Sequence, residues 1–146
     1  MNGPVLGPPV LEARGLVRRL DEEIPVTLVD HVDLAVAQGE FVAVTGPSGS
    51  GKSSLLYPLG LLDAPTEGDV LIRGRSTAGL SGDERAGLRL ATLGFVFQFH
   101  FLLPEFSALD NVVLPMRALG RLSPPAMRER GPSLLGSLGL ADHAHK

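Results

Sequence analysis

Residues 46–53 read Gly-Pro-Ser-Gly-Ser-Gly-Lys-Ser, and this stretch decides which fold the chain adopts. It matches the pattern G-x-x-x-x-G-K-[ST], in which a glycine-rich loop surrounds a phosphate group with backbone N–H groups. Glycine is required where the loop wraps tightly, because a side chain there would keep the backbone away from the anion. The predicted phosphate-binding residues are Gly46, Pro47, Ser48, Gly49, Ser50, Gly51, Lys52, Ser53 and Ser54.

The segments on either side of this loop have the composition that such a site needs. Residues 41–45, Phe-Val-Ala-Val-Thr, form a short apolar run that predicts a buried parallel strand. A helix is predicted from about residue 51 to 62, with its positive N-terminus directed at the phosphates. Lys52 would place its charge on the β- and γ-phosphates, and the Ser53 hydroxyl would ligate Mg²⁺. The alternative is a Gly/Ser turn that holds a lysine by chance, which the flanking strand and helix disfavour.

Composition limits the class of protein. The 146 residues suffice for one modest domain, and 44% hydrophobic with 20% charged residues predicts a folded, soluble chain. The net charge of −3 and the lack of a basic run argue against a nucleic-acid partner. Cysteine is absent, which excludes disulfides, zinc–thiolate sites and cysteine nucleophiles.

The N-terminal residues 1–9 are rich in glycine and proline and predict a flexible leader rather than a signal peptide. No stretch approaches the roughly 20 apolar residues that span a bilayer. Apolar and polar residues mostly alternate over 26–36, which predicts one or two strands of an antiparallel layer. Further strands are predicted at 10–17, 70–72 and 93–97, and a turn-like segment at 18–25. Helices are predicted at 83–91, 107–119 and 124–138, with Ser81 or Asp83, Ser107 and Ser123 as N-caps.

Three further segments carry a family resemblance. Residues 61–70, Leu-Leu-Asp-Ala-Pro-Thr-Glu-Gly-Asp-Val, resemble the stretch after the P-loop helix of ABC transporter ATP-binding proteins. Residues 94–98, Gly-Phe-Val-Phe-Gln, resemble the strand and glutamine of their Q-loop. Phe101-Leu102-Leu103-Pro104, Asn111-Val112 and Leu114-Pro115 resemble the branch that serves lipoprotein release and macrolide-type export. The resemblance covers roughly residues 10–146.

The resemblance implies an α/β fold: a RecA-like P-loop NTPase core with an N-terminal antiparallel β-subdomain, over about 10–98, and the start of a helical subdomain over about 99–146. It implies ATP and Mg²⁺ as cofactors, with Ser53 and Gln98 near the metal and Lys52 and Gln98 as catalytic residues. It also implies a homodimer with a second ATP-binding domain, and an integral membrane permease as partner. The chain would then be cytoplasmic, peripheral on the inner face of the cell membrane.

The chain departs from the family pattern in three ways. The signature motif, the Walker B aspartate, the catalytic glutamate and the switch histidine are missing, which predicts an incomplete domain, the N-terminal part of a longer protein. Leu20 stands near the place of the usual adenine-stacking aromatic residue, so weak base preference is expected. Pro58 lies within the predicted P-loop helix and should bend or interrupt it, since proline removes a helical hydrogen bond.

Three interpretations of function remain open from the sequence: an ABC-type ATPase subunit, a non-catalytic nucleotide-binding fragment, or another P-loop NTPase such as a small kinase. Two interpretations are also open for the apolar cluster after Gln98, which is either core packing or an exposed docking patch. We expect His100 to be structural, His143 and His145 to lie in a solvated tail, and His31 to lie at the surface. The members of the cluster are Phe99, Phe101, Leu102, Leu103 and Phe106.

Overall fold

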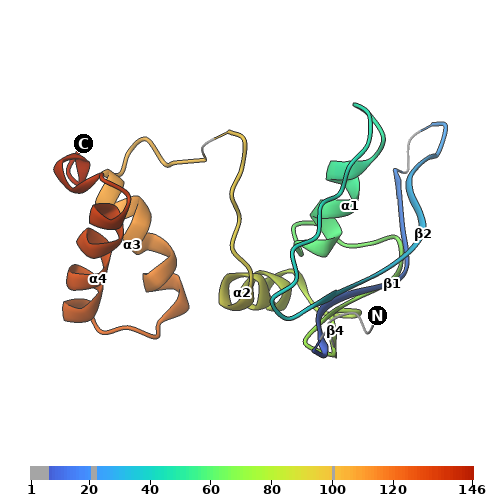
Figure 1. The fold of residues 1–146 in the computed structure, drawn as a ribbon, viewed down its shortest axis with the longest axis horizontal. Coiled ribbons are helices and arrows are strands. Elements are labelled where there is room, and N and C mark those ends of the chain that lie inside the picture. Colours follow the sequence, from blue (N-terminus) through green and yellow to red (C-terminus); the bar gives the residue numbers. More distant parts are fainter. Residues whose placement is uncertain (1–6, 21–22, 100) are drawn as a thin grey trace, which may run out of the picture. The chain divides into compact units, whose positions relative to one another are not determined.

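The computed structural model describes residues 7–20, 23–99 and 101–146 (Figure 1). The chain divides into two compact units, one ending at Arg89 and the other comprising Leu90–Lys146. Residues 1–6 of the predicted leader (1–9) and the prediction for His100 lie outside the described residues.

The first unit contains a four-stranded antiparallel sheet, as the alternating pattern predicts. Its spatial order is β2-β1-β3-β4, so β1 pairs with a neighbour on each side. The strands are β1 (Pro9–Leu20), β2 (Val26–Ala37), β3 (Glu67–Ile72) and β4 (Arg75–Ser76). Pairing with β2 at both ends makes β1 begin inside the predicted leader, at Pro9, and continue through residues 18–20 of the segment predicted to turn.

The register between β1 and β2 is irregular. Val29 and Val32 pair with Arg18 and Leu16, which leaves two residues of β2 opposite one of β1. His31 lies in this irregularity with a φ of 45°, a conformation that non-glycine residues rarely adopt. A carboxylate fills a second gap in the ladder, where Asp33 Oδ1 accepts a 2.7 Å hydrogen bond from the Gly15 N–H.

The helix α1 (Lys52–Leu59) packs against β1 and β2, and it ends earlier than predicted. Pro58 is fully buried and lies one residue before the helix ends. The Gly60 N–H keeps the ordinary helical bond to Leu56 O at 2.8 Å, whereas the Leu62 N–H reaches back to Tyr57 O at 2.9 Å. The helix therefore runs through Pro58 and ends one residue after it, before the predicted end at residue 62.

Two predicted strands are absent. Residues 41–45 and 93–97 are extended but form no strand in the structure. Phe41 is 93% exposed and Val96 is fully exposed, so neither segment is buried. A parallel strand takes all its hydrogen bonds from neighbouring strands rather than from a hairpin partner. Among the described residues no segment pairs with either stretch, and apolar composition alone therefore does not make them strands.

Three longer helices follow, each close to its predicted range: α2 (Gly82–Thr92), α3 (Ala108–Leu119) and α4 (Pro124–Ser137). The predicted caps are confirmed: the hydroxyls of Ser81, Ser107 and Ser123 accept backbone N–H groups at the three helix starts. The C-terminal residues, with η1 (Ala141–His143), are more than a solvated tail. The carbonyls of Ala144 and Lys146 accept hydrogen bonds from the first turn of α3.

The helices α3 and α4 pack closely in the second unit (Figure 1). A Cβ built on Gly131 of α4 would lie 2.7 Å from Leu109 Cδ1 and 2.9 Å from Val113 Cγ2. The missing side chain thus allows the two helices to approach. Within the described part of the chain, every helix is too short or too polar to cross a lipid bilayer.

Candidate nucleotide-binding site

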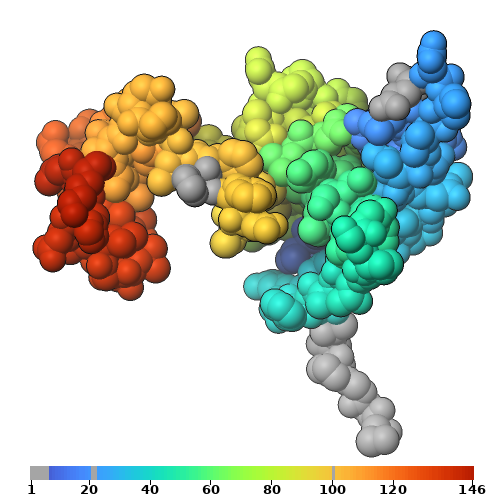
Figure 2. Space-filling model, turned by 90° about the horizontal axis from the view of Figure 1, so that it is seen from above, coloured from blue at the N-terminus to red at the C-terminus, as the bar shows by residue number. Residues whose placement is uncertain are grey.

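The glycine-rich loop joins residue 45 to α1 and is exposed at the surface of the first unit, in turquoise in Figure 2. A turn closed by the Ser50 N–H on Pro47 O, at 3.3 Å, shapes its middle. Gly51 has a φ of 85°, and a Cβ there would lie 2.7 Å from the Leu28 carbonyl oxygen of β2. Sequence reasoning missed this contact, which explains why the loop needs glycine at position 51.

The helix α1 begins at Gly51 without a side-chain cap. Its first ladder bond is donated by Leu55 N–H to Gly51 O at 2.9 Å. The backbone N–H groups of Lys52 and Ser53 have no acceptor among the described residues. Unpaired N–H groups at a helix start, together with the helix dipole, form an anion-binding site. The donor set therefore fits a phosphate group.

The Lys52 ammonium lies over the same loop. Its Nζ donates to Gly46 O at 2.8 Å and to Pro47 O at 2.6 Å, with Ser50 Oγ at 3.5 Å. No carboxylate of the described residues forms an ion pair with it. A phosphate oxygen is a stronger acceptor for an ammonium group than a neutral carbonyl. The lysine can therefore exchange its carbonyl partners for phosphate.

The residues expected near Mg²⁺ have different surroundings. Ser53 is exposed, and its hydroxyl has no hydrogen-bond partner in the described part of the chain. The described residues contain no group of three or more His, Asp or Glu side chains that could hold a metal by themselves. Mg²⁺ usually keeps several waters and binds through one or two protein groups plus phosphate oxygens, and the Ser53 hydroxyl is one such protein group. Gln98 is exposed and belongs to the second unit, and its metal and catalytic roles remain predictions.

The structure favours the exposed interpretation of the apolar cluster. All five members are exposed, from 42% for Leu103 to 74% for Phe101. Two aromatic residues before the cluster are in contact with each other and with it. Phe97 stacks on Phe95 at 5.4 Å between ring centroids and meets Phe101 edge-on at 5.1 Å. Sequence reasoning missed the role of Asn111, whose side chain binds the backbone of this segment.

Other polar groups stand apart from the loop. His31 Nδ1 contacts Asp30 Oδ1 at 2.7 Å, and both side chains are exposed, which confirms the surface prediction.

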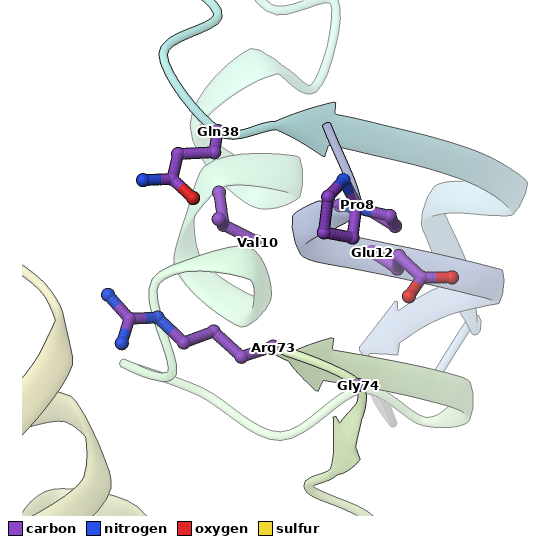
Figure 3. A pocket seen from close by; sticks show the side chains of 7 residues that line it. Pro8, Val10, Glu12, Gln38, Arg73 and Gly74 are labelled. Atoms are coloured by element: carbon purple, nitrogen blue, oxygen red, sulfur yellow. The ribbon is translucent and has the colours of Figure 1, made fainter. Parts of the chain in front are cut away.

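A separate hollow of about 410 Å³ lies between the start of β1 and the end of β3 (Figure 3). None of the predicted site residues lines it. Its lining residues are Pro8, Pro9, Val10, Glu12, Gln38, Arg73 and Gly74.

Comparison with known proteins agrees with the loop geometry. The family model described as ABC transporter matches residues 29–146. The chain belongs to the ABC transporter family. A solved structure of the ATP-binding cassette MJ0796, in a dimeric post-hydrolysis state bound to ADP and Pi, is 36% identical with a TM-score of 0.84. That alignment covers 93% of this chain and 61% of the cassette, and it confirms the partial P-loop NTPase fold.

Curated relatives in this ABC transporter family carry the name lipoprotein-releasing system ATP-binding protein LolD. The protein of Aquifex aeolicus is 53% identical over 115 residues, which cover 79% of this chain and 51% of the relative. That of Anaeromyxobacter dehalogenans is 49% identical over 139 residues, covering 94% and 58%. The chain thus spans between half and three fifths of the length of these relatives. The resemblance to the lipoprotein-release branch, based on residues 101–104, 111–112 and 114–115, is confirmed.

Proposed function

We propose that this chain binds Mg·ATP at residues 46–54 and supplies the phosphate-binding part of an ABC transporter subunit of the lipoprotein-releasing type. The observation that carries the proposal is the uncapped start of α1 with its unpaired N–H groups, next to a loop whose carbonyls bind the Lys52 ammonium. A ligand with adjacent phosphates satisfies both kinds of donor at once. The names of the curated relatives support the same assignment.

The chemistry of the complete subunit follows from this arrangement. Lys52 leaves the carbonyls of Gly46 and Pro47 and binds phosphate oxygens, where its charge stabilises the negative charge that develops during the reaction. Ser53 would hold Mg²⁺, which would supply Lewis-acid chemistry to the phosphates. Gln98 orients the water that attacks the γ-phosphate in line with the leaving oxygen. These roles of Lys52, Ser53 and Gln98 belong to the proposal.

The proposed partners follow from the family. A second ATP-binding domain would complete the site in a homodimer, as the dimeric cassette MJ0796 suggests. An integral membrane permease would cover the apolar cluster, whose five members are all exposed. The protein would work in the cytoplasm, peripheral on the inner face of the membrane, and would couple ATP binding and hydrolysis to lipoprotein release or export.

A second function has one observation in its favour: the chain by itself binds nucleotide without hydrolysing it. No Asp or Glu of the described residues is hydrogen bonded to Lys52 or to the loop around it. Hydrolysis needs a group that positions or deprotonates water, and phosphate binding does not. The third alternative, a small kinase or other P-loop NTPase, is not supported because the family model matches an ABC transporter.

Nucleotide titration tests the proposal, and the chain provides a matched control because its only two lysines are Lys52 and Lys146. We expect Lys52→Ala to weaken Mg·ATP binding by about 10- to 100-fold, the loss of a charged hydrogen bond. Lys146→Ala should leave the affinity unchanged. Equal affinity of Lys52→Ala and the parent chain would contradict the phosphate site.

The same titration with GTP tests base preference. Base stacking on an aromatic side chain is worth about 1–3 kcal/mol, and Leu20 cannot supply it. We therefore expect ATP and GTP to bind with similar affinity through their phosphates. A strong preference for ATP would contradict the claim about the base and leave the phosphate site intact.

A further inference from the structure

Asn111, in the first turn of α3, binds the loop that precedes its own helix. Its Oδ1 accepts the Leu103 N–H at 2.9 Å. Its Nδ2 donates to Leu103 O and Phe106 O, both at 3.1 Å, and to Ser107 O at 3.0 Å. An asparagine amide has two N–H groups, so three carbonyls share them. One half-buried side chain thus holds both ends of the segment 103–107.

The held segment is a turn with apolar side chains on its outside. Phe106 N–H donates to Leu103 O at 3.1 Å, and Pro104 occupies the position that proline favours in such a turn. Phe101 is 74% exposed and Leu102 is 61% exposed immediately before it. In Figure 1 this chain runs into the start of α3. The turn is therefore fixed by polar contacts from behind while its apolar groups face solvent.

The loop is therefore ordered although its apolar side chains are not buried. An exposed apolar loop ordinarily gains its conformation only when its side chains are buried, and the ordering then costs free energy at the moment of binding. Here the backbone groups of Leu103 and Phe106 are satisfied before any partner arrives. We infer that Asn111 is a positioning residue that pre-organises residues 101–107 for docking onto an apolar surface of the permease.

The identity of the partner rests on the proposed function, whereas the role of Asn111 does not. The partner surface should be mainly apolar, to cover Phe101 and Leu102. It should also carry a basic group, because Glu105 stands at the tip of the turn without an ion pair among the described residues. We call the hydrogen bonds from Asn111 to this segment the clamp. Without the clamp only a fraction of the molecules has the loop in its docking conformation, and the apparent affinity for the permease falls by that fraction.

A tryptophan placed in the loop tests the clamp directly, because the natural chain contains none. Phe101→Trp is introduced into the 146-residue chain, and its fluorescence anisotropy is compared with and without Asn111→Ala. We expect Asn111→Ala to lower the anisotropy and to remove the hydrogen-exchange protection of the Leu103 amide. Nucleotide affinity should stay the same, since the phosphate loop lies in the other unit.

Ser107→Ala is the matched control, because it removes the cap of α3 but keeps every backbone atom that Asn111 binds. It should lower the melting temperature and leave the anisotropy of the introduced tryptophan unchanged. Unchanged anisotropy in Asn111→Ala would overturn the inference. An equal fall in both variants would also overturn it, because the effect would then belong to the helix start in general.

The docking step is measured with detergent-solubilised permease of the lipoprotein-releasing system from the same genome. We expect Asn111→Ala to weaken binding about tenfold and Ser107→Ala to leave it unchanged. Equal binding of parent and Asn111→Ala would overturn the docking role. If Lys52→Ala bound ATP as well as the parent while the tryptophan anisotropy changed as expected, the proposed function would fail and the clamp would stand.

Discussion

At the start of α3 the Ser107 hydroxyl accepts a hydrogen bond from the Asp110 N–H, whereas the start of α1 at Gly51 has no side-chain cap. At a capped helix start the N–H groups already donate hydrogen bonds within the chain and are not available to a ligand. The uncapped start of α1 keeps its N–H groups available, and the Lys52 ammonium binds the carbonyls of the preceding loop. The uncapped start of α1 is therefore the arrangement that the proposed phosphate site requires, whereas the start of α3 is not.

The largest expected effect concerns catalysis at the open helix start. Phosphate binding at Gly51 and Lys52 does not by itself position a water, and no described carboxylate is bonded to the loop. Groups that act as a unit lose nearly the full catalytic effect when some are absent. We expect steady-state phosphate release by this chain to stay below about 1 s⁻¹, the low end of typical turnover. Turnover at or above that rate, abolished by Lys52→Ala, would contradict the prediction.

The second prediction asks whether the open start depends on glycine. Gly51→Ala introduces a Cβ 2.7 Å from the Leu28 carbonyl oxygen, at a φ of 85°. Gly49→Ala is the control, since its φ is 79° but no atom lies within 4 Å of the added Cβ. Both variants incur about 1–2 kcal/mol for the left-handed conformation. Gly51→Ala should lose about 1–3 kcal/mol more in denaturant unfolding through the clash. Equal losses would mean that the loop can move away from β2.

The third prediction removes a cap and so makes α3 resemble α1. Ser107→Ala should lower the free energy of unfolding by about 1 kcal/mol, the usual value of an N-cap hydroxyl. Ser133→Ala, at an exposed position within α4, is the matched control and should change it by less than about 0.5 kcal/mol. Chemical denaturation checks both. A loss as small as that of the control would show that the C-terminal carbonyls, which also bind α3, replace the cap.

The smallest expected effect lies at the capped start of α2. The Ser81 backbone N–H, and then its hydroxyl, donate to Glu84 and hold the pKa of that carboxyl below its ordinary value of 4.5. A lowered folded-state pKa adds stability above the ordinary value, and this stability is lost as pH falls through the folded pKa. The melting temperature of Glu84→Gln should therefore lie slightly below that of the parent at neutral pH. The difference should vanish at acidic pH.

The control for this titration is Asp83→Asn, which removes the neighbouring carboxyl but none of the bonds to Ser81. The difference in melting temperature between Asp83→Asn and the parent should not vanish at acidic pH in the same way. A pH-independent gap between Glu84→Gln and the parent would contradict the role of the carboxylate.

Local chemistry made much of this fold predictable. Ser107 and Ser123 cap helices because a hydroxyl at that place satisfies orphan N–H groups, and both appear in the sequence just before their helices. The alternation over 26–36 reflects one mostly half-buried and one exposed face of β2. The glycine and lysine pattern of 46–53 is likewise local, because it reflects the tight backbone conformation that the loop needs.

The failures involve contacts that a sequence pattern does not contain. Residues 41–45 have the composition of a strand, but a parallel strand exists only where neighbours pair with it. The clash of a Cβ at Gly51 with Leu28 depends on two segments meeting in space. Asn111 looks like any polar residue of a helix start, and only the path of the preceding turn shows what it binds.

The irregular register of β2 has a consequence for association between chains. In the described sheet β2 is an edge strand, and an edge with a regular row of free N–H and C=O groups invites another chain to add a strand. His31, with its φ of 45°, breaks that row in the middle, and Asp30 beside it carries a charge. A second molecule cannot match its own ladder to this edge over more than a few residues. In the described sheet the bulge thus disfavours edge-to-edge pairing at β2.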